Sequence, residues 1–418
     1  MCGICGVIRF DGAAVEREEI SRMKELLTHR GPDSKGVYLE GPVGLGHRRL
    51  SIIDVAHGHQ PMSNEDQTVW VVFNGMIYNY KPLMETLTRL GHQFATSCDT
   101  EILVHAYEEW GTDMLERLNG QFAFAIWDGR RLFMARDRMG EKPLYYTVNN
   151  KALYFASEIK SLLVHIPAKP NIPPDWLVFE NTLTDDTLFE GIKELPPAHY
   201  AIVQSQNVSL KRYWSIPNEL DESMTEHEAV QRLSDLIYDA VIIRLQSEVP
   251  VGMYLSGGLD SSIIACIAKP SCVFTSYYDG QGKFDEREPA RIIARHIKAE
   301  QFFVTLSPKE VPNLFKTIIY HLDQPISSSS TISSFNLARK ARKYFKVVLN
   351  GQGADELFGG YGRYVLMNHE VELGRTPFFN QYTSMARRFW NPNIFGDPAL
   401  RYLELNQRVK PRTSLPAG

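Results

Sequence analysis

The stretch from Val251 to Ser262 reads Val-Gly-Met-Tyr-Leu-Ser-Gly-Gly-Leu-Asp-Ser-Ser, and it decides the fold class of the second half of the chain. Its first five residues are mostly apolar and predict a buried strand, and residues 262–268 predict a helix. The two glycines between them allow the backbone to approach a ligand closely. A helix N-terminus adds free N–H groups and a partial positive charge. This order of elements predicts a phosphate-binding loop.

Asp260 gives this loop a second property. A carboxylate would repel phosphate directly, so it fits the loop as a ligand of a bridging Mg²⁺. The chain has no Gly-Lys-Ser/Thr sequence, which excludes a Walker A loop. A glycine turn with a Ser/Asp helix cap is the alternative for this motif taken alone.

Strands and helices alternate in the residues that surround this loop. The expected strands are 251–255, 273–277 and 346–349, and the expected helices are 262–268 and 288–298. A capping box at Thr225–Glu228 opens a further helix with an apolar face. The residues of that face are Val230, Leu233, Leu236, Ile237, Ala240 and Val241. The alternation predicts an α/β domain with a parallel sheet.

The first half of the chain has a different pattern. Short apolar or aromatic runs are separated by Asn-Gly, Asp-Gly and Asn-Asn pairs, which predicts hairpins in stacked antiparallel sheets. The runs are 70–73, 122–127, 132–135 and 153–156, and helical patterns occupy 20–27 and 102–110. This half is therefore expected to be an α+β domain with flanking helices.

We place the two domains at residues 1–205 and 225–418, with a linker at 206–224. The composition suits such a protein: 418 residues, 44% hydrophobic and 22% charged. A net charge of -4 gives no sign of binding to nucleic acid or to a membrane surface. The sequence has no apolar run of about 18 residues and no signal-peptide pattern. Five cysteines, an odd number, fit a reducing cytoplasm.

Cys2 is the second candidate functional feature. Removal of Met1 would make Cys2 the first residue, with a thiol and a free α-amino group on one residue. The amine then serves as the general base for the thiol, which is the N-terminal-nucleophile arrangement. The alternative is an ordinary buried cysteine. Cys2 and Cys5 also have redox or zinc spacing, but no second Cys/His pair lies nearby to complete a metal site.

Together these features give the chain a resemblance to a known family. Cys2-Gly3-Ile4 and the loop Ser256–Ser262 are similar to the corresponding motifs of glutamine-hydrolysing asparagine synthetases, and the resemblance covers nearly the whole chain. The further motifs that carry it are His29–Asp33, Arg49–Asp54, Asn74-Gly75, Arg136–Arg138, Lys142–Tyr146 and Gly353–Tyr361. The resemblance implies a class II glutamine amidotransferase sandwich followed by an ATP-pyrophosphatase domain.

The resemblance implies a glutaminase site in the first domain. Cys2 attacks the side-chain amide of glutamine, and Asn74 with the Gly75 N–H stabilises the oxyanion. Arg49 is expected to hold the α-carboxylate and Asp99 the α-ammonium group. Two alternatives remain open: Asn74-Gly75 as a plain type I′ turn, and Asp99 as the N-cap of the following helix.

The resemblance implies an ATP site in the second domain, where a carboxylate is adenylated and ammonia displaces AMP. The expected ATP-binding residues are Leu255, Ser256, Gly257, Gly258, Leu259, Asp260, Ser261, Ser262, Gly351 and Gln352. Asp260 and Asp355 are the expected Mg²⁺ ligands. Asp285 and Glu286 match a family motif and are equally compatible with a role as first-turn helix acids.

The sequence departs from the family pattern in four places. Met76 and Gln352 stand where glutamate is common, and Gln324 replaces the glutamate of Asp-Glu-Pro. The loss of a charged contact at Met76 is expected to cost about 1.5–3 kcal/mol of glutamine binding. The chain also stops at Gly418, where family members usually continue, so we expect a C-terminally incomplete second domain.

The resulting expectation is an ATP-dependent ligase of asparagine biosynthesis that forms AMP and pyrophosphate. Its partners are glutamine or ammonia, ATP with Mg²⁺, and a carboxylate, with aspartate favoured. We expect no nucleic acid or membrane partner and a cytoplasmic location, and a homodimer is compatible. The alternatives are amidation or cyclisation of another carboxylate, and a non-catalytic or split-enzyme subunit.

Overall fold

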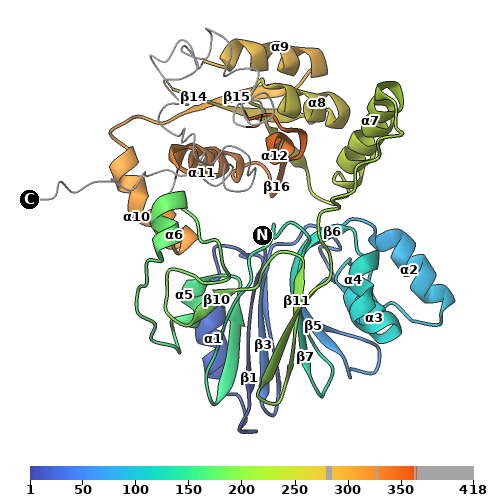
Figure 1. Cartoon of the computed structure of the whole chain (residues 1–418), viewed down its shortest axis with the longest axis vertical. Helices are drawn as coiled ribbons and strands as arrows, with labels where there is room; N and C mark the ends of the chain where they lie inside the picture. Colours follow the sequence, from blue (N-terminus) through green and yellow to red (C-terminus); the bar gives the residue numbers. More distant parts are fainter. Residues whose placement is uncertain (279–284, 326–327, 362–363, 365–418) are drawn as a thin grey trace, which may run out of the picture.

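The structure is a computed structural model that describes residues 1–278, 285–325, 328–361 and 364. The expectation of a C-terminally incomplete second domain concerns residues outside these ranges. Figure 1 shows two halves, a layered β-rich half below and a sheet with surrounding helices above. The N-terminus lies at the end of the lower half that faces the upper one.

The lower half contains two six-stranded antiparallel sheets. The first, in strand order, consists of β10 (Ile192–Glu194), β8 (Tyr145–Val148), β9 (Ala152–Ala156), β1 (Gly3–Arg9), β3 (Val43–Arg49) and β2 (Ser34–Glu40). The second consists of β12 (Asn207–Arg212), β11 (His199–Gln204), β7 (Leu132–Arg136), β6 (Gly120–Trp127), β5 (Trp70–Ile77) and β4 (Met62–Ser63). The predicted stack of antiparallel sheets is confirmed.

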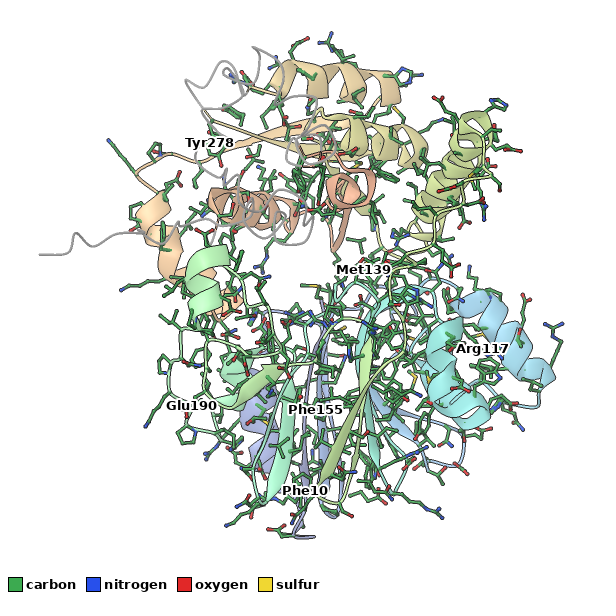
Figure 2. The ribbon with its side chains drawn as sticks, in the orientation of Figure 1. Phe10, Arg117, Met139, Phe155, Glu190 and Tyr278 are labelled. Carbon is green, nitrogen blue, oxygen red and sulfur yellow. The ribbon has the colours of Figure 1, made fainter. Side chains whose placement is uncertain are left out.

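Strand β6 shows why this sequence forms a layered core. Its side chains alternate between the two faces, as a pleated strand requires. Phe122, Phe124 and Ile126 belong to the apolar cluster that includes the helices on the outer face. Ala123 and Ala125 belong to the cluster between the sheets, where Phe155 also lies (Figure 2). Both faces of the sheet are therefore buried, with Phe122 and Phe124 on the outer face.

Helices cover both outer faces of the sandwich. On the first sheet these are α1 (Arg17–Glu25) and α5 (Ile159–Leu162). On the second they are α2 (Tyr80–Arg89), α3 (Glu101–Trp110), the 3₁₀ turn η1 (Gly111–Asp113) and α4 (Met114–Arg117). The short helix α6 (Pro174–Phe179) lies toward the upper half (Figure 1).

The upper half contains the predicted parallel sheet. Its strands, in order, are β15 (Glu300–Thr305), β14 (Cys272–Tyr277), β13 (Val251–Tyr254) and β16 (Val347–Leu349). Its helices are α7 (Glu226–Ile243), α8 (Leu259–Ala268), α9 (Arg287–Ile297), α10 (Val311–Leu322), α11 (Ser329–Ala341) and α12 (Ala354–Phe358). The predicted α/β class is confirmed.

Three local features refine the sequence analysis. The capping box at Thr225 and Glu228 is present, with both reciprocal hydrogen bonds. Strand β12 pairs with β11, so the second sheet of the lower half continues beyond residue 205 into the segment assigned as linker. Helix α8 begins at Leu259 and not at Ser262, because Gly258 is its N-cap and Ser261 and Ser262 lie in its first turn.

Among the described residues, no helix is long and apolar enough to cross a membrane.

Candidate active site

A cavity of about 350 Å³ lies between the two halves, beside the N-terminus. It brings together all five residues predicted for glutamine binding and hydrolysis, which come from separate elements of the sandwich. These residues are Cys2, Arg49, Asn74, Gly75 and Asp99. The convergence of a thiol, a guanidinium, an amide and a carboxylate gives the cavity the groups needed to bind an amino acid and attack its amide.

Cys2 directly precedes β1, the third strand in from the β2 edge of the first sheet. The Leu50 N–H lies 3.4 Å from its Sγ, and Arg30 Nε donates to its carbonyl oxygen at 2.8 Å. Burial raises the pKa of the Cys2 thiol and lowers the pKa of the Met1 α-ammonium group to about 5. The Met1 amine is therefore neutral at pH 7, and the Cys2 thiol needs a base to ionise.

Cys5 has a different environment from Cys2. Its side chain is fully buried in the apolar cluster beneath α1, and its pKa is raised by burial to about 12. All five cysteines are free. The Cys2-x-x-Cys5 spacing therefore reflects one residue at the cavity and one in the core.

Asn74 and Gly75 lie inside β5, where they pair with Ala123 and Phe122 of β6. The alternative of a type I′ turn is therefore wrong: the strand continues through this Asn-Gly pair because β6 supplies its cross-strand partners. Asn74 is 1% exposed, and neither its Oδ1 nor its Nδ2 has a hydrogen-bond partner among the described residues. A buried amide without a partner is costly and points to a ligand.

Gly75 fits this position because there is no room for a side chain. A Cβ there would lie 2.2 Å from the Gln121 carbonyl oxygen and 2.6 Å from the Phe73 ring. The glycine thus permits the close packing of β5 on β6 beside the Asn74 amide.

Arg49 is fixed at the end of β3 by the loop that follows it. Its guanidinium donates to the carbonyl oxygens of Ile53 at 2.9 Å, Asp54 at 2.7 Å and Val55 at 3.1 Å. These carbonyls are neutral, so the positive charge of Arg49 has no carboxylate partner within salt-bridge distance among the described residues. The group is therefore oriented and available for a carboxylate ligand.

Asp99 lies opposite, and its Oδ2 accepts the Ile77 N–H of β5 at 3.0 Å. The N-cap residue of α3 is Thr100, so the alternative in which Asp99 caps this helix is wrong. Burial raises the pKa of Asp99 to about 6, and the Ile77 hydrogen bond only partly offsets this effect. A cationic ligand would stabilise the carboxylate that burial destabilises.

The cavity also contains residues that the sequence analysis did not assign. Gln60 accepts the Phe73 N–H at 2.7 Å and donates to Thr100 Oγ1 at 3.1 Å, and so connects β5 to the start of α3. Lys142 donates to Gln121 Oε1 at 2.7 Å, and burial lowers its pKa. Lys142 lies within a motif of the resemblance and was identifiable from it; no sequence signal pointed to Gln60.

Met76 also lines the cavity. Its side chain is buried in an apolar cluster with Ile53 and Tyr78, and Ile243 at the end of α7 packs against this cluster. An apolar group thus occupies the position of the charged contact discussed above, and the expected loss of glutamine affinity stays a prediction.

The upper half completes the cavity through β16 and the loop after it. Lys346, Val347, Val348 and Asn350 line it. Lys346 forms an ion pair with Asp33 across the interface at 2.6 Å, and this contact outweighs burial and lowers the pKa of Asp33. The glutaminase residues therefore share one cavity with the strand that leads to Gly351.

The predicted phosphate loop is held by hydrogen bonds among its own residues. Ser256 Oγ and Ser261 Oγ are 2.9 Å apart, and the Gly258 N–H donates to Ser256 Oγ at 3.2 Å. Gly257 has a φ of 84°, which favours glycine. The loop follows β13 and opens α8, and buried Leu255 holds its start through a hydrogen bond to Phe274.

The loop after β16 lies against the phosphate loop. A Cβ on Gly351 would be 2.9 Å from the Ser261 backbone nitrogen and 3.2 Å from Asp260 Cβ, so glycine is needed for this approach. Asp355 follows in the first turn of α12. Asp260 lies in the first turn of α8, so the two predicted Mg²⁺ ligands come from the first turns of two helices. Gln352 is exposed, and its N–H donates to Asn350 Oδ1 at 2.9 Å.

Two further acids of the upper half, Asp285 and Asp323, already have protein partners. Asp285 forms a bidentate pair with Arg287, with contacts of 2.6 to 3.0 Å. Glu286 is the N-cap residue of α9, and burial raises its pKa. Asp323, beside Gln324, bonds to Lys160 of the lower half at 3.0 Å.

Comparison with known proteins also divides the chain into two domains. A family model described as "Glutamine amidotransferase domain" matches residues 1–214, and one described as "Asparagine synthase" matches residues 232–412. The chain is 39% identical to "Asparagine synthetase [glutamine-hydrolyzing] 1" of Bacillus subtilis over 377 residues, 87% of this chain and 59% of the relative.

Two further relatives show the range of names among similar proteins. "Putative asparagine synthetase [glutamine-hydrolyzing] 2" of Methanocaldococcus jannaschii is 32% identical over 86% of this chain and 76% of its own length. "Amidase chyE" of Penicillium rubens is 33% identical over 86% of this chain and 59% of its own length. The chain thus spans about three fifths of the Bacillus and Penicillium relatives.

Proposed function

Because the chain belongs to the glutamine-hydrolysing asparagine synthetase family, we propose that it hydrolyses glutamine at Cys2 and transfers the ammonia to a carboxylate activated by ATP. The observation that carries the proposal is the buried, unpartnered amide of Asn74 in one cavity with Cys2, Arg49 and Asp99.

The proposed hydrolysis of glutamine requires that Met1 is first removed. The α-amine of Cys2 then accepts the thiol proton, and the thiolate attacks the glutamine side-chain carbonyl. Asn74 Nδ2 and the Gly75 N–H stabilise the oxyanion. The Cys2 α-ammonium group then returns its proton to the leaving nitrogen as the C–N bond breaks, and ammonia leaves. Water hydrolyses the thioester to glutamate. Arg49 and Asp99 hold the α-carboxylate and the α-ammonium group.

In the second half, the substrate carboxylate attacks the α-phosphorus of ATP, and pyrophosphate leaves. The loop Ser256–Ser262 holds the phosphates, and Leu255 and Gly351 border the nucleotide. Asp260 and Asp355 would hold Mg²⁺, which when bound neutralises charge on the leaving group. Ammonia that reaches the acyl adenylate displaces AMP and forms the amide. The apolar Val347 and Val348 side of the cavity supports transfer of neutral ammonia toward Gly351.

Aspartate is the acceptor that the family favours. Gln352 favours a second candidate, a different carboxylate or an internal amine, because a glutamine side chain cannot accept a proton as a carboxylate does. The similarity to a relative named an amidase supports keeping this candidate. Met76 replaces a charged contact to glutamine, so free ammonia is the alternative nitrogen source.

The test is product analysis by mass spectrometry. The purified full chain is incubated with ATP, Mg²⁺, amide-¹⁵N glutamine and a panel of carboxylic acids that includes aspartate. We expect AMP, pyrophosphate and one ¹⁵N-labelled amide, and Cys2→Ala should retain amide formation only with ammonium. Formation of ADP and phosphate would contradict the proposal. Turnover of another acid well above aspartate would select the second candidate.

A further inference from the structure

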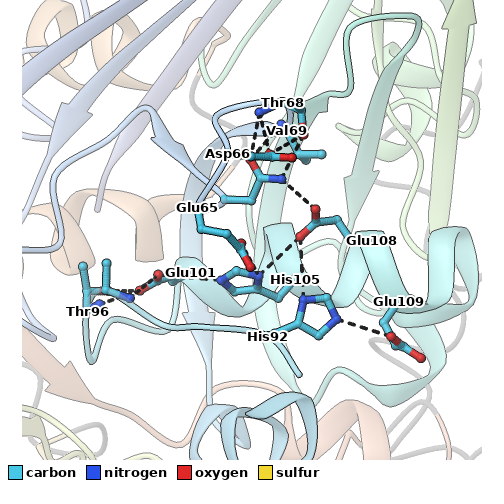
Figure 3. Close-up of polar contacts among 12 residues, drawn as sticks. Glu65, Asp66, Thr68, Val69, His92, Thr96, Glu101, His105, Glu108 and Glu109 are labelled. Carbon is cyan, nitrogen blue, oxygen red and sulfur yellow. Dashed lines mark hydrogen bonds and ion pairs between the residues drawn. The ribbon is translucent and has the colours of Figure 1, made fainter. Parts of the chain in front are cut away.

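A polar cluster on the outer face of the second sheet lies apart from the residues assigned above. It contains Glu65 after β4, His92 after α2, and His105 and Glu108 on α3 (Figure 3). His105 is completely buried, and neither of its ring nitrogens has a hydrogen-bond partner among the described residues. A buried imidazole among carboxylates without a hydrogen bond needs an explanation.

Ligand atoms of Glu65, His92 and His105 lie within 4.8 Å of one another, close enough to share a metal ion, and Glu108 adjoins His92 and His105. His105 Nδ1 lies 3.5 Å from Glu65 Oε2 and 3.3 Å from Glu108 Oε2, and His92 Nδ1 lies 3.9 Å from Glu108 Oε2. In a tetrahedral zinc site with bonds of about 2.0–2.2 Å, neighbouring donor atoms are about 3.4 Å apart. The observed separations are near this value and longer than good hydrogen bonds.

The far side of each imidazole faces a second carboxylate. His92 Nε2 lies 3.3 Å from Glu109 Oε2, and His105 Nε2 lies 3.7 Å from Glu101 Oε1. Metal-binding histidines usually direct their other N–H to a carboxylate in this way. Glu108 is oriented as well, because its Oε1 accepts from Asn64 Nδ2 at 2.6 Å.

We propose that His92, His105, Glu65 and Glu108 bind one Zn²⁺ ion. Two neutral imidazoles and two carboxylates balance its charge, and four protein ligands make the site structural. Glu101 also accepts the N–H groups of Ala95 and Thr96 at 2.7 Å. Zinc therefore braces the loop that carries Asp99 into the glutamine cavity.

The site is accessible to an ion at Glu65, and its less buried ligands can be replaced with little risk to the fold. Glu65 has a side chain that is 45% exposed, whereas His105 is buried and its replacement risks the fold. The ligand variants are therefore Glu65→Gln and His92→Gln. Glu109→Gln removes only an outer carboxylate, and Glu18→Gln, on exposed α1, is the matched control. All are made in the full chain with Cys2→Ala, which excludes binding at that thiol.

The experiment measures zinc stoichiometry by elemental analysis and affinity by competition with a chelator, after removal of metal. We expect about one zinc ion per chain in the Cys2→Ala parent and in the Glu18→Gln control. Glu65→Gln and His92→Gln should weaken binding at least tenfold, and Glu109→Gln about 10- to 100-fold. Zinc should raise the melting temperature of the parent and leave that of His92→Gln unchanged.

Cobalt gives an independent readout of geometry. Co²⁺ in place of zinc should produce the intense visible absorption of a tetrahedral site, and Glu65→Gln should change it. A parent that binds no zinc at micromolar concentration would overturn the proposal and leave a metal-free imidazole caged by carboxylates. Equal zinc affinity in the parent and both ligand variants would overturn it as well.

Discussion

Asn74 shows how a single residue can be placed for function at a cost to stability. Its amide is buried within β5 without a hydrogen-bond partner, which a purely structural residue in a sheet would not require. Cys2 lines the same cavity. The burial of an unused donor beside a nucleophile is typical of an oxyanion site, in which the donor is paired only when charge develops.

We expect Asn74→Ala to lower kcat for glutamine hydrolysis roughly 100- to 1000-fold, because one oxyanion donor is lost. Stability should change by only about 1 kcal/mol, since no internal hydrogen bond is broken. Steady-state glutaminase assays and thermal unfolding check both. The control is Asn149→Ala, in the exposed turn between β8 and β9, which should leave hydrolysis unchanged. A tenfold or smaller loss of kcat would argue against the oxyanion role.

The ionised carboxylate of Asp99 lowers the stability of the empty protein, although the same charge is expected to bind the α-ammonium group of glutamine. Its pKa is raised from 3.8 in a model compound to about 6 by burial. Between these values the folded protein keeps a proton that the unfolded chain has released, so stability from this residue falls as pH rises from 3.8 to 6. Above pH 6 the buried charge is a cost of the empty site.

Asp99→Asn should therefore stabilise the empty protein at pH 8, by an amount on the order of 1–3 kcal/mol, and much less at pH 4. The same variant should raise KM for glutamine about 10- to 100-fold, because the α-ammonium group loses its charged partner. Denaturant unfolding at both pH values and glutaminase kinetics measure these effects. Equal stabilisation at pH 4 and pH 8 would contradict the assigned pKa shift.

At the scale of elements, the proposed nucleotide site depends on the contact between two loops. Both loops follow parallel strands, β13 and β16, which are neighbours in the sheet. Parallel strands bring their carboxyl ends to one edge, where ligands of α/β sheets bind. Gly351 allows the second loop to touch the first at Asp260 and Ser261.

Gly351→Ala should disrupt this contact, because the new Cβ meets a backbone nitrogen at 2.9 Å. We expect ATP-dependent pyrophosphate release to fall at least about tenfold, with a stability loss of about 1–3 kcal/mol. Hydrolysis of glutamine by the same variant serves as the internal control and should continue. Pyrophosphate release at the wild-type rate would show that the two loops do not cooperate in nucleotide binding.

For the molecule as a whole, the interface links the glutamine site to the upper half. The Glu248 carboxylate accepts the N–H groups of Asp54 at 2.9 Å and Val55 at 3.1 Å. This is the loop whose carbonyls orient Arg49. The segment before β13 therefore stabilises the side chain that is expected to hold the glutamine α-carboxylate.

A second connection runs along the other side of the interface. Glu158 binds Arg30, which holds the Cys2 carbonyl, and it also binds Lys160, which pairs with Asp323 of the upper half. Burial raises the pKa of Glu158, but its contacts with His29, Arg30 and Lys160 outweigh burial and lower the pKa to about 2. The position of Cys2, the proposed nucleophile, thus depends on charges from both halves.

Glu248→Ala should loosen the 53–55 loop and raise KM for glutamine by about three- to tenfold, which corresponds to about 1 kcal/mol. The ammonium-dependent reaction should keep its kcat. Glu222→Ala, at an exposed position in the connecting segment, is the control. An unchanged KM in Glu248→Ala would mean that Arg49 is held by the lower half alone.

The sequence by itself determined the two fold classes and the chemical groups of both candidate sites. Three features are local patterns that nearby residues are sufficient to specify. They are the capping box at Thr225, the strand–loop–helix order around Gly257, and the side chains of β6 that alternate between the two faces of the sheet. The order of motifs along the chain added the glutamine-site residues, which the structure collects in one cavity.

Only the tertiary structure decided features that depend on distant partners. An Asn-Gly pair suits a turn as well as a strand, and pairing with β6 selected the strand for Asn74. Glu65, His92 and His105 are far apart in sequence and meet because α3 packs on the second sheet. Glu248 had no local signal, because its role arises where the two halves touch. Long-range packing decides these contacts, and it is not encoded in any single segment.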